Sequence, residues 1–242
     1  MVCARNLPSI GLAASVVVNP AGYDRLQSQV IPGYGSLARL AVALLSCSPE
    51  AAASGASVLV AGCGTGAELL EAVAQRPDWQ LTALDPSAEM LAESQQRLCA
   101  DPASATIHWQ QSTVEALVHQ PGMEGCFSGA LSVLVLQSLP DDGSKLAFLT
   151  ALARCLKPGA QLVLVDLMRS ALSSLEPQLD AAWLSFQSAS GLDATAAVGV
   201  SQGLHPIGLA RLTSLVNAAG FGDPARIFQA LGFEGFLLQK RS

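Results

Sequence analysis

The chain has 242 residues, of which half are hydrophobic and 13% are charged. This composition is typical of a globular chain with a sizeable core, and it excludes an intrinsically disordered one. The formal net charge is −6, and the 13 lysines and arginines are scattered. No basic run is available to follow a nucleic-acid backbone, so we expect no nucleic-acid partner.

The six cysteines are also scattered, without a Cys-x-x-Cys pair or a histidine cluster at metal-ligand spacing. They predict no metal site and no disulfide framework, but thiols in a reducing compartment. The apolar stretch within the first 18 residues is interrupted by Pro8 and Gly11, which argues against a signal peptide. No apolar stretch is long enough to span a bilayer. We therefore expect a cytoplasmic protein without a membrane partner.

Two helices are expected first, over residues 21–47, separated around Pro32 and Gly33. Apolar strands then alternate with amphipathic helices. The expected strands are 56–62, 79–85, 105–111, one within 127–139, and 160–167, and the expected helices are 67–76, 86–100 and 141–156, the last stopped by Pro158 and Gly159. Continuously apolar strands that alternate with helices predict a parallel sheet covered on both faces.

The alternation stops after residue 167. Residues 168–206 are expected to be helical and irregular, followed by a helix over 208–221 and two strands around Gly232. A final hairpin of this kind adds an antiparallel strand to a parallel sheet. We interpret residues 1–242 as a single domain. Its expected parts are an N-terminal helical lead (1–50), a core (51–167), a helical insertion (168–206) and a C-terminal helix with a strand pair (207–242).

Three glycines, Gly62, Gly64 and Gly66, leave the first expected strand and lead into a helix. Because glycine has no Cβ atom, a ligand can lie directly against this backbone. Asp85 ends the next strand, and a right-handed strand–helix–strand unit places its carboxylate beside the glycines. There it would accept hydrogen bonds from two ribose hydroxyls. The pair predicts a nucleoside site, although GCGTGA also satisfies the dinucleotide pattern G-x-G-x-x-G/A and leaves that alternative open.

Several stretches together resemble class I S-adenosylmethionine-dependent methyltransferases. They are VLVAGCGTGAELL, LTALDPSAEML, LSVLVLQSLPDDGSKLAFLTALARCLKPGAQLVLVDL and the closing strand pair. The resemblance covers roughly residues 20–240 and implies a Rossmann-like α/β fold. Its sheet would be mostly parallel with seven strands, the last antiparallel, and with helices on both faces. QSQVIPGYGSL and ARLTSLVNAAGF are similar to one subgroup, the carboxy-S-adenosylmethionine synthases, which act in tRNA modification.

The resemblance implies cofactor contacts for particular positions. Gly62, Cys63 and Gly64 would line the methionine and ribose part of the cofactor, and Asp85 would bind the ribose hydroxyls. Pro86 would lie beside the adenine, with Thr113 and Val114 at the adenine edge. Val133 would lie under the methionine, and Tyr34 would contact the cofactor from the N-terminal helices.

The sequence shows three departures from the family pattern. Val60 and Ala61 replace an acidic residue of the first strand, Thr113 stands where an aspartate is frequent, and Val133 replaces a polar residue of the synthases. These departures weaken the expected cofactor affinity more than the assignment to the class.

Methyl transfer from a sulfonium needs mainly alignment in a dry pocket, and it needs a base only if the acceptor must lose a proton. His205 is a weak candidate for that base, and it also reads as a loop histidine without a catalytic task. Asp166 is a second candidate but reads more simply as a helix cap. Trp183 and Phe186 would shape an acceptor pocket or pack in the core.

The function expected from the sequence is therefore that of a methyltransferase that uses S-adenosyl-L-methionine on a small-molecule acceptor. The alternatives are a carboxy-S-adenosylmethionine synthase or tRNA-modifying enzyme, an NAD-dependent oxidoreductase, and a non-catalytic cofactor-binding protein. The synthases hold their extra carboxylate with an arginine, but the matching position here is Ala197, and no lysine or arginine occurs between Arg169 and Arg211. We therefore expect plain S-adenosylmethionine. The oligomeric state stays open, with a homodimer as one option.

Overall fold

The computed structural model describes residues 19–101, 106–169, 174–192 and 203–242. Seven strands form one sheet in the order β3-β2-β1-β4-β5-β7-β6. Strand β7 runs antiparallel to both its neighbours, whereas the pairs among β1 to β5 are parallel. The expected mixed sheet is confirmed. Its strands are β1 (Ser57–Ala61), β2 (Gln80–Asp85), β3 (His108–Gln111), β4 (Phe127–Val133), β5 (Leu156–Leu167), β6 (Ala225–Ala230) and β7 (Phe233–Gln239).

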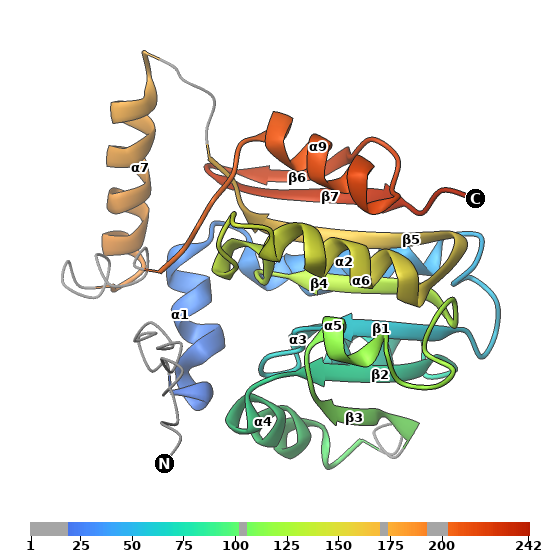
Figure 1. The fold of residues 1–242 in the computed structure, drawn as a ribbon. Coiled ribbons are helices and arrows are strands. Elements are labelled where there is room, and N and C mark those ends of the chain that lie inside the picture. The colour runs from blue at the N-terminus through green and yellow to red at the C-terminus, as the bar shows by residue number, and fades with distance from the viewer. Residues whose placement is uncertain (1–18, 102–105, 170–173, 193–202) are drawn as a thin grey trace, which may run out of the picture.

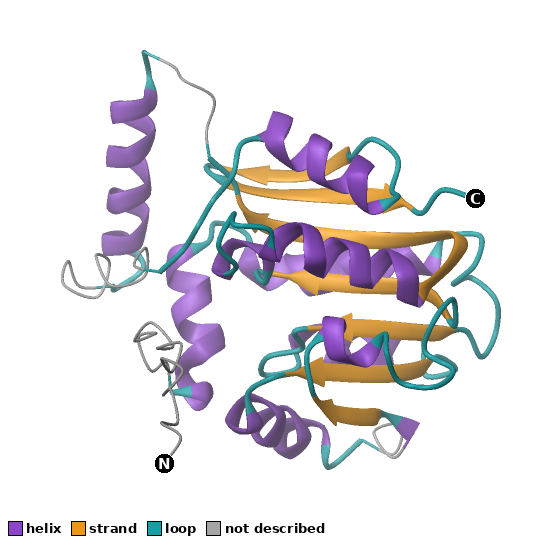
Figure 2. Cartoon of the chain, in the orientation of Figure 1, coloured by secondary structure: helices purple, strands orange, loops and turns teal. Residues whose placement is uncertain are grey.

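Helices cover both faces of the sheet, as Figures 1 and 2 show. One face carries α5 (Val114–Leu117), α6 (Ser144–Cys155) and α9 (Leu209–Ala219) over one apolar cluster. The other face carries α2 (Tyr34–Ser46), α3 (Ala67–Gln75) and α4 (Ala88–Leu98) over a second cluster. The central strands are buried between the two clusters, which explains their continuously apolar sequences.

Local sequence signals explain where several helices begin and end. Two N-terminal helices form as expected, because Gly33 adopts a left-handed conformation (φ 84°) between α1 (Tyr23–Val30) and α2. The side chain of Ser87 accepts a hydrogen bond from the backbone N–H of Met90 (3.2 Å) and caps α4. Helix α9 ends at Gly220, also left-handed (φ 102°).

The boundary between α6 and β5 lies earlier than expected. Helix α6 ends at Cys155, and β5 already begins at Leu156, which pairs with Phe127 of β4. The pairing resumes only at Gly129 and Gln161, so the strand bulges between these two points. Pro158 has no N–H for the ladder, and Gly159 adopts φ 78°, so the Lys-Pro-Gly turn forms this bulge and is not the signal that stops the helix.

Helices α1 and α7 (Glu176–Ala189) stand at the carboxyl end of the parallel strands (Figure 1). The indole N–H of Trp183 on α7 donates to the carbonyl of Val30 at the end of α1 (2.8 Å), and its ring packs edge-on against Phe233. Trp183 therefore joins the insertion to the N-terminal helices. None of the helices in the described part of the chain has the length and apolar character to cross a membrane.

Candidate functional site

The strand order reverses between β1 and β4, and in open α/β sheets ligands bind at the carboxyl ends of the strands beside such a reversal. The glycine loop (residues 62–66) lies at this point. The N–H groups of Gly62 and Cys63 donate to the carbonyl of Leu84 on β2 (2.7 and 2.9 Å), and the N–H of Gly66 donates to Cys63 (2.8 Å). These bonds attach the loop to the neighbouring strand, so its shape is set by the protein itself.

The three glycines are needed for different reasons. A Cβ atom at Gly62 would lie 2.4 Å from Val135, and one at Gly66 would lie 2.2 Å from the hydroxyl of Ser94. At Gly64 a Cβ atom would meet no atom within 4 Å, although its φ is +49°. Gly62 and Gly66 therefore permit close packing within the protein, whereas Gly64 borders the open space in which a ligand could contact the backbone.

Asp85 ends β2 and faces the glycine loop. Its Oδ2 accepts a hydrogen bond from the N–H of Gly64 (2.8 Å), and its Oδ1 accepts one from Ser87 (2.9 Å). Burial raises the pKa of Asp85, while these two N–H groups act in the opposite direction. No described cation forms an ion pair with it. Each carboxylate oxygen has a further lone pair, so the group can accept two more hydrogen bonds, as a ribose diol requires.

The segment after β3 also lies beside Asp85. The N–H of Ser112 donates to the Asp85 carbonyl (3.2 Å), and the Gln111 side chain donates to the carbonyl of Pro86 (3.3 Å). The hydroxyl of Thr113 accepts from Ala116 (3.3 Å) and caps the short helix α5. Val114, only 3% exposed, packs in the core. The structure thus brings this segment to the site, with the Thr113 hydroxyl already engaged in the cap.

Two other predicted cofactor residues line the loop and the adjacent strand. Burial raises the pKa of the Cys63 thiol, which stays protonated and unreactive. Val133 is the last residue of β4 and pairs with Val165 of β5. The following residue, Leu134, has φ +61°, an unfavourable conformation for a leucine, and it turns the chain at the carboxyl end of the strand.

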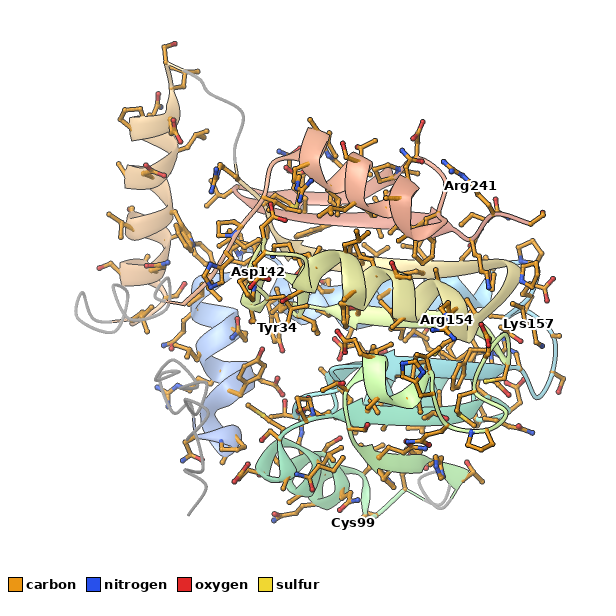
Figure 3. All side chains as sticks on the ribbon, viewed as in Figure 1. Tyr34, Cys99, Asp142, Arg154, Lys157 and Arg241 are labelled. Carbon is orange, nitrogen blue, oxygen red and sulfur yellow. The ribbon has the colours of Figure 1, made fainter. Side chains whose placement is uncertain are left out.

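Tyr34 belongs to a cluster that joins α1, the glycine loop and α4. Its hydroxyl donates to Oδ1 of Asp24 (2.8 Å), which also accepts from the hydroxyl of Thr65 (3.0 Å). Arg97 forms an ion pair with the other oxygen of Asp24 (2.5 Å) and donates to the carbonyl of Thr65 (2.7 Å). Figure 3 shows Tyr34 toward the carboxyl end of the strands. Its hydroxyl therefore positions the N-terminal helices against the loop.

Two residues of this region were missed at the level of sequence. Burial, and then the charges of Glu68, Asp24, Asp85 and Asp166, raise the pKa of Tyr23. The charges of the carboxylates at the ends of β2 and β5 therefore act on its phenol. Glu68, in the first turn of α3, is 7% exposed, and burial raises its pKa to about 7. The helical pattern placed only apolar side chains on the buried face of α3, so it carried no signal for a buried glutamate.

Asp166 is buried at the end of β5, with 2% of its surface exposed. Its Oδ1 accepts from the N–H of Gln137 (2.9 Å) in the short 3₁₀ helix η3 (Leu136–Ser138), and its Oδ2 has no hydrogen-bond partner among the described residues. Burial raises its pKa to about 7. This geometry agrees with a capping role.

His205 does not join the cluster around Asp85. Its backbone N–H donates to the carbonyl of Gln137 (2.6 Å), and its side chain is exposed beside the loop that follows β4. Within the described residues, no group of three or more His, Cys, Asp or Glu side chains is arranged to hold a metal ion. Ala197 lies outside the described residues.

S-adenosylmethionine fits this donor and acceptor set. The open space at Gly64, the remaining lone pairs of Asp85 and the adjacent chain at residues 111–114 match a nucleoside with a free diol. The bound cofactor supplies a methyl group on a sulfonium centre.

Comparison with known proteins agrees with this site. Residues 58–159 match a family model described as a methyltransferase domain. The matched segment begins in β1, contains the glycine loop and Asp85, and ends at Gly159. No curated protein matches the sequence.

Three of the solved structures that share the fold illustrate the likeness. The first is a possible exported protein from Bordetella parapertussis, with a TM-score of 0.66 and 18% identity, in which the alignment covers 93% of this chain and 80% of that one. The second is the [4+2]-cyclase SpnF, with a TM-score of 0.62, 15% identity and coverage of 86% of this chain and 81% of that one. The third is a Haemonchus contortus phosphoethanolamine N-methyltransferase in complex with phosphomonomethylethanolamine and S-adenosylhomocysteine, with a TM-score of 0.63, 13% identity and coverage of 92% of this chain and 58% of that one. This chain thus spans four fifths of the first two and under two thirds of the third. At such identities the likeness shows a common architecture, which also serves a cyclase.

The family match and the position of the glycine loop at the strand reversal agree with each other. Residues 58–159 are therefore similar to a methyltransferase domain, and the chain as a whole has a Rossmann-like α/β fold.

Proposed function

We propose that this protein transfers the methyl group of S-adenosylmethionine to a small-molecule acceptor. The observation that carries the proposal is the 2.8 Å hydrogen bond between Asp85 Oδ2 and the N–H of Gly64. It shows the carboxylate and the open glycine side by side at the strand reversal, which is the arrangement that a ribose diol and its adjoining chain require.

The acceptor is proposed to be small because the described surface offers little positive charge for a polynucleotide. Five arginines are engaged in ion pairs with carboxylates, and the whole chain is acidic. Figure 3 places Arg154 and Lys157 toward the amino ends of the strands, away from the glycine loop. The Haemonchus neighbour, which is in complex with the small molecule phosphomonomethylethanolamine, is consistent with an acceptor of this size.

Calorimetry with S-adenosylhomocysteine and with NADH tests the proposal. S-adenosylhomocysteine should bind with a stoichiometry of one, and NADH should not bind measurably. NADH can share the ribose contact at Asp85, but its pyrophosphate needs free N–H groups, and those of Gly62, Cys63, Gly64 and Gly66 are already bonded within the protein. Binding of NADH in preference would support the oxidoreductase alternative and overturn the proposal.

A further inference from the structure

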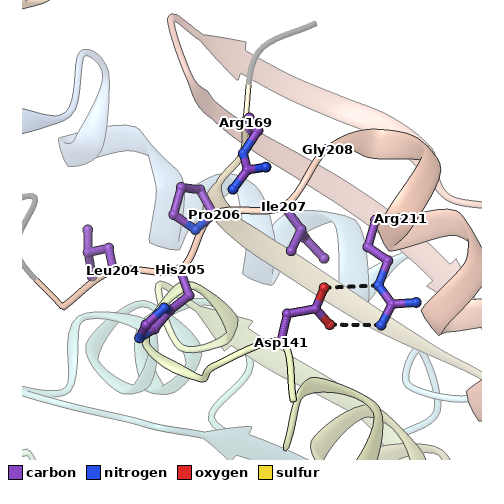
Figure 4. A pocket seen from close by; sticks show the side chains of 8 residues that line it. All are labelled: Asp141, Arg169, Leu204, His205, Pro206, Ile207, Gly208 and Arg211. Carbon is purple, nitrogen blue, oxygen red and sulfur yellow. Dashed lines mark hydrogen bonds and ion pairs between the residues drawn. The ribbon is translucent and has the colours of Figure 1, made fainter. Parts of the chain in front are cut away.

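A cavity lies at the carboxyl end of β5, two strands away from the glycine loop. It has a volume of about 280 Å³ and is lined by Arg169, which follows β5, by the segment His205–Gly208, by Arg211 on α9 and by Asp141 from the loop after β4 (Figure 4). The backbone N–H of Arg169 donates to the backbone carbonyl of Ile207 (2.9 Å), so a backbone hydrogen bond joins the end of β5 to the segment that contains His205.

The charges in this cavity do not balance. Arg211 forms a two-bond ion pair with Asp141 (2.9 and 3.0 Å), so these two side chains neutralise each other. Arg169 takes part in no ion pair or side-chain hydrogen bond within the described part of the chain. Figure 4 shows its guanidinium group lying between Pro206 and Ile207. The exposed guanidinium of Arg169 therefore carries a positive charge that no described carboxylate neutralises by an ion pair.

Arg25, Arg39 and Arg169 are all exposed and form no ion pair within the described residues, and of these three only Arg169 lines the cavity. An unpaired guanidinium that faces a hollow presents a planar set of donors suited to a carboxylate or phosphate group.

The cavity also has a suitable position relative to the glycine loop. Strand β5 lies next to β4, which lies next to β1, so its end is about 10 Å from the end of β1 at the usual strand spacing. The backbone N–H of His205 in the cavity wall donates a hydrogen bond to the carbonyl of Gln137, and the backbone N–H of Gln137 donates one to Asp166 at the end of β5. A cofactor held over the ends of β1, β2 and β4 therefore leaves the end of β5 free for a second molecule.

We propose that this cavity binds an anionic group, a carboxylate or a phosphate monoester, on the methyl acceptor, with Arg169 as its principal ligand. The identification of the ligand as the methyl acceptor rests on the proposed function, whereas the anion site itself does not depend on it. The acceptor thus has an anionic end at β5 and its nucleophile directed toward β4.

The test is calorimetry with inorganic phosphate and, separately, with malonate, first on the free protein and then on protein saturated with S-adenosylhomocysteine. Arg169→Gln should weaken binding of the anion that the wild type prefers by about tenfold or more, because it removes the charge and keeps much of the side chain. Arg39→Gln removes one positive charge from an exposed helix and is the matched control, expected to leave binding unchanged.

A second variant guards against a trivial loss of folding. Asp141→Asn releases Arg211 from its ion pair and should tighten anion binding severalfold, an effect that damage to the fold would not produce. Equal binding of both anions to wild type and Arg169→Gln, or no gain in Asp141→Asn, would overturn the anion site. Failure of S-adenosylhomocysteine to bind, with anion binding intact in the free protein, would instead overturn the proposed function alone.

Discussion

The carboxylate of Asp85 is the residue on which cofactor binding most depends. Asp85→Ala removes the acceptor for the ribose hydroxyls and also releases the N–H of Gly64. Charge-assisted hydrogen bonds contribute about 1.5–3 kcal/mol each, so affinity for S-adenosylhomocysteine should fall by about tenfold or more. Calorimetry measures this loss. Asp78→Ala, which removes a carboxylate before β2 that pairs with Arg76, is the control and should bind normally; equal affinity in both variants would remove Asp85 from the site.

Gly64 should be sensitive to substitution in binding more than in folding. A valine there fills the open space beside Asp85 and adopts a left-handed conformation that costs about 1–2 kcal/mol. We expect Gly64→Val to fold with a modestly lower melting temperature and to lose S-adenosylhomocysteine. Gly66→Val should unfold at a much lower temperature, because its Cβ would collide with Ser94. Normal binding by Gly64→Val would place the ligand elsewhere.

Asp166 should make stability depend on pH. Burial raises its pKa from 3.8 to about 7 in the folded protein, so the unfolded chain releases this proton first as pH rises. Its contribution to stability is complete below about pH 4 and is lost by about pH 7. Melting temperature should therefore fall between about pH 4 and pH 7 in the wild type, and fall less in Asp166→Asn. An identical slope in the variant would contradict the assigned burial.

At the scale of elements, the ion pair between Arg97 and Asp24 holds α1 on the glycine loop. Both side chains are about one third exposed, and pairs of this kind contribute about 0.2–1 kcal/mol, so Arg97→Gln should leave the melting temperature nearly unchanged. Hydrogen exchange in residues 23–30 should nevertheless accelerate, because Arg97 also holds the Thr65 carbonyl. Arg154→Gln, which breaks a surface pair at the opposite end of the sheet, should not have this effect.

Most elements could be predicted from the sequence because their causes are local. Alternation of apolar strands and helices predicted the sheet, and Ser87 and Gly33 marked boundaries that the structure confirms. The bulge in β5 was not predicted, because Pro158 and Gly159 serve equally to end a helix or to deform a strand.

The candidate site could be predicted only where it lies within one strand–helix–strand unit. Gly64 and Asp85 meet as the handedness of that unit requires. Tyr23 and Tyr34 could not be ranked by sequence, because their orientation depends on how α1 packs. Arg169 and Arg211 face one cavity because β5 ends, and α9 begins, at the same edge of the sheet. No local sequence pattern shows this long-range arrangement.

At the scale of the whole molecule, the form of the cofactor distinguishes the proposed methyltransferase from a carboxy-S-adenosylmethionine synthase. A carboxylate on the transferred group needs a cationic partner near the glycine loop, and a buried carboxylate without one loses several kcal/mol of solvation. In the described part of the chain, Arg169 lies at β5, and Arg97 is already paired with Asp24. Plain S-adenosylmethionine carries no such group and suits the apolar ends of β1 and β4.

Native mass spectrometry of the protein, incubated with equal amounts of S-adenosylmethionine, its carboxylated form and NADH, tests the central claim most directly. We expect a single dominant complex, with the mass of one bound S-adenosylmethionine or its demethylated product, and we expect Asp85→Ala to lose it. A dominant complex with the carboxylated form would support the synthase instead. A dominant complex with NADH, or the absence of any complex with S-adenosylmethionine, would contradict the assignment of the glycine loop and Asp85 to this cofactor.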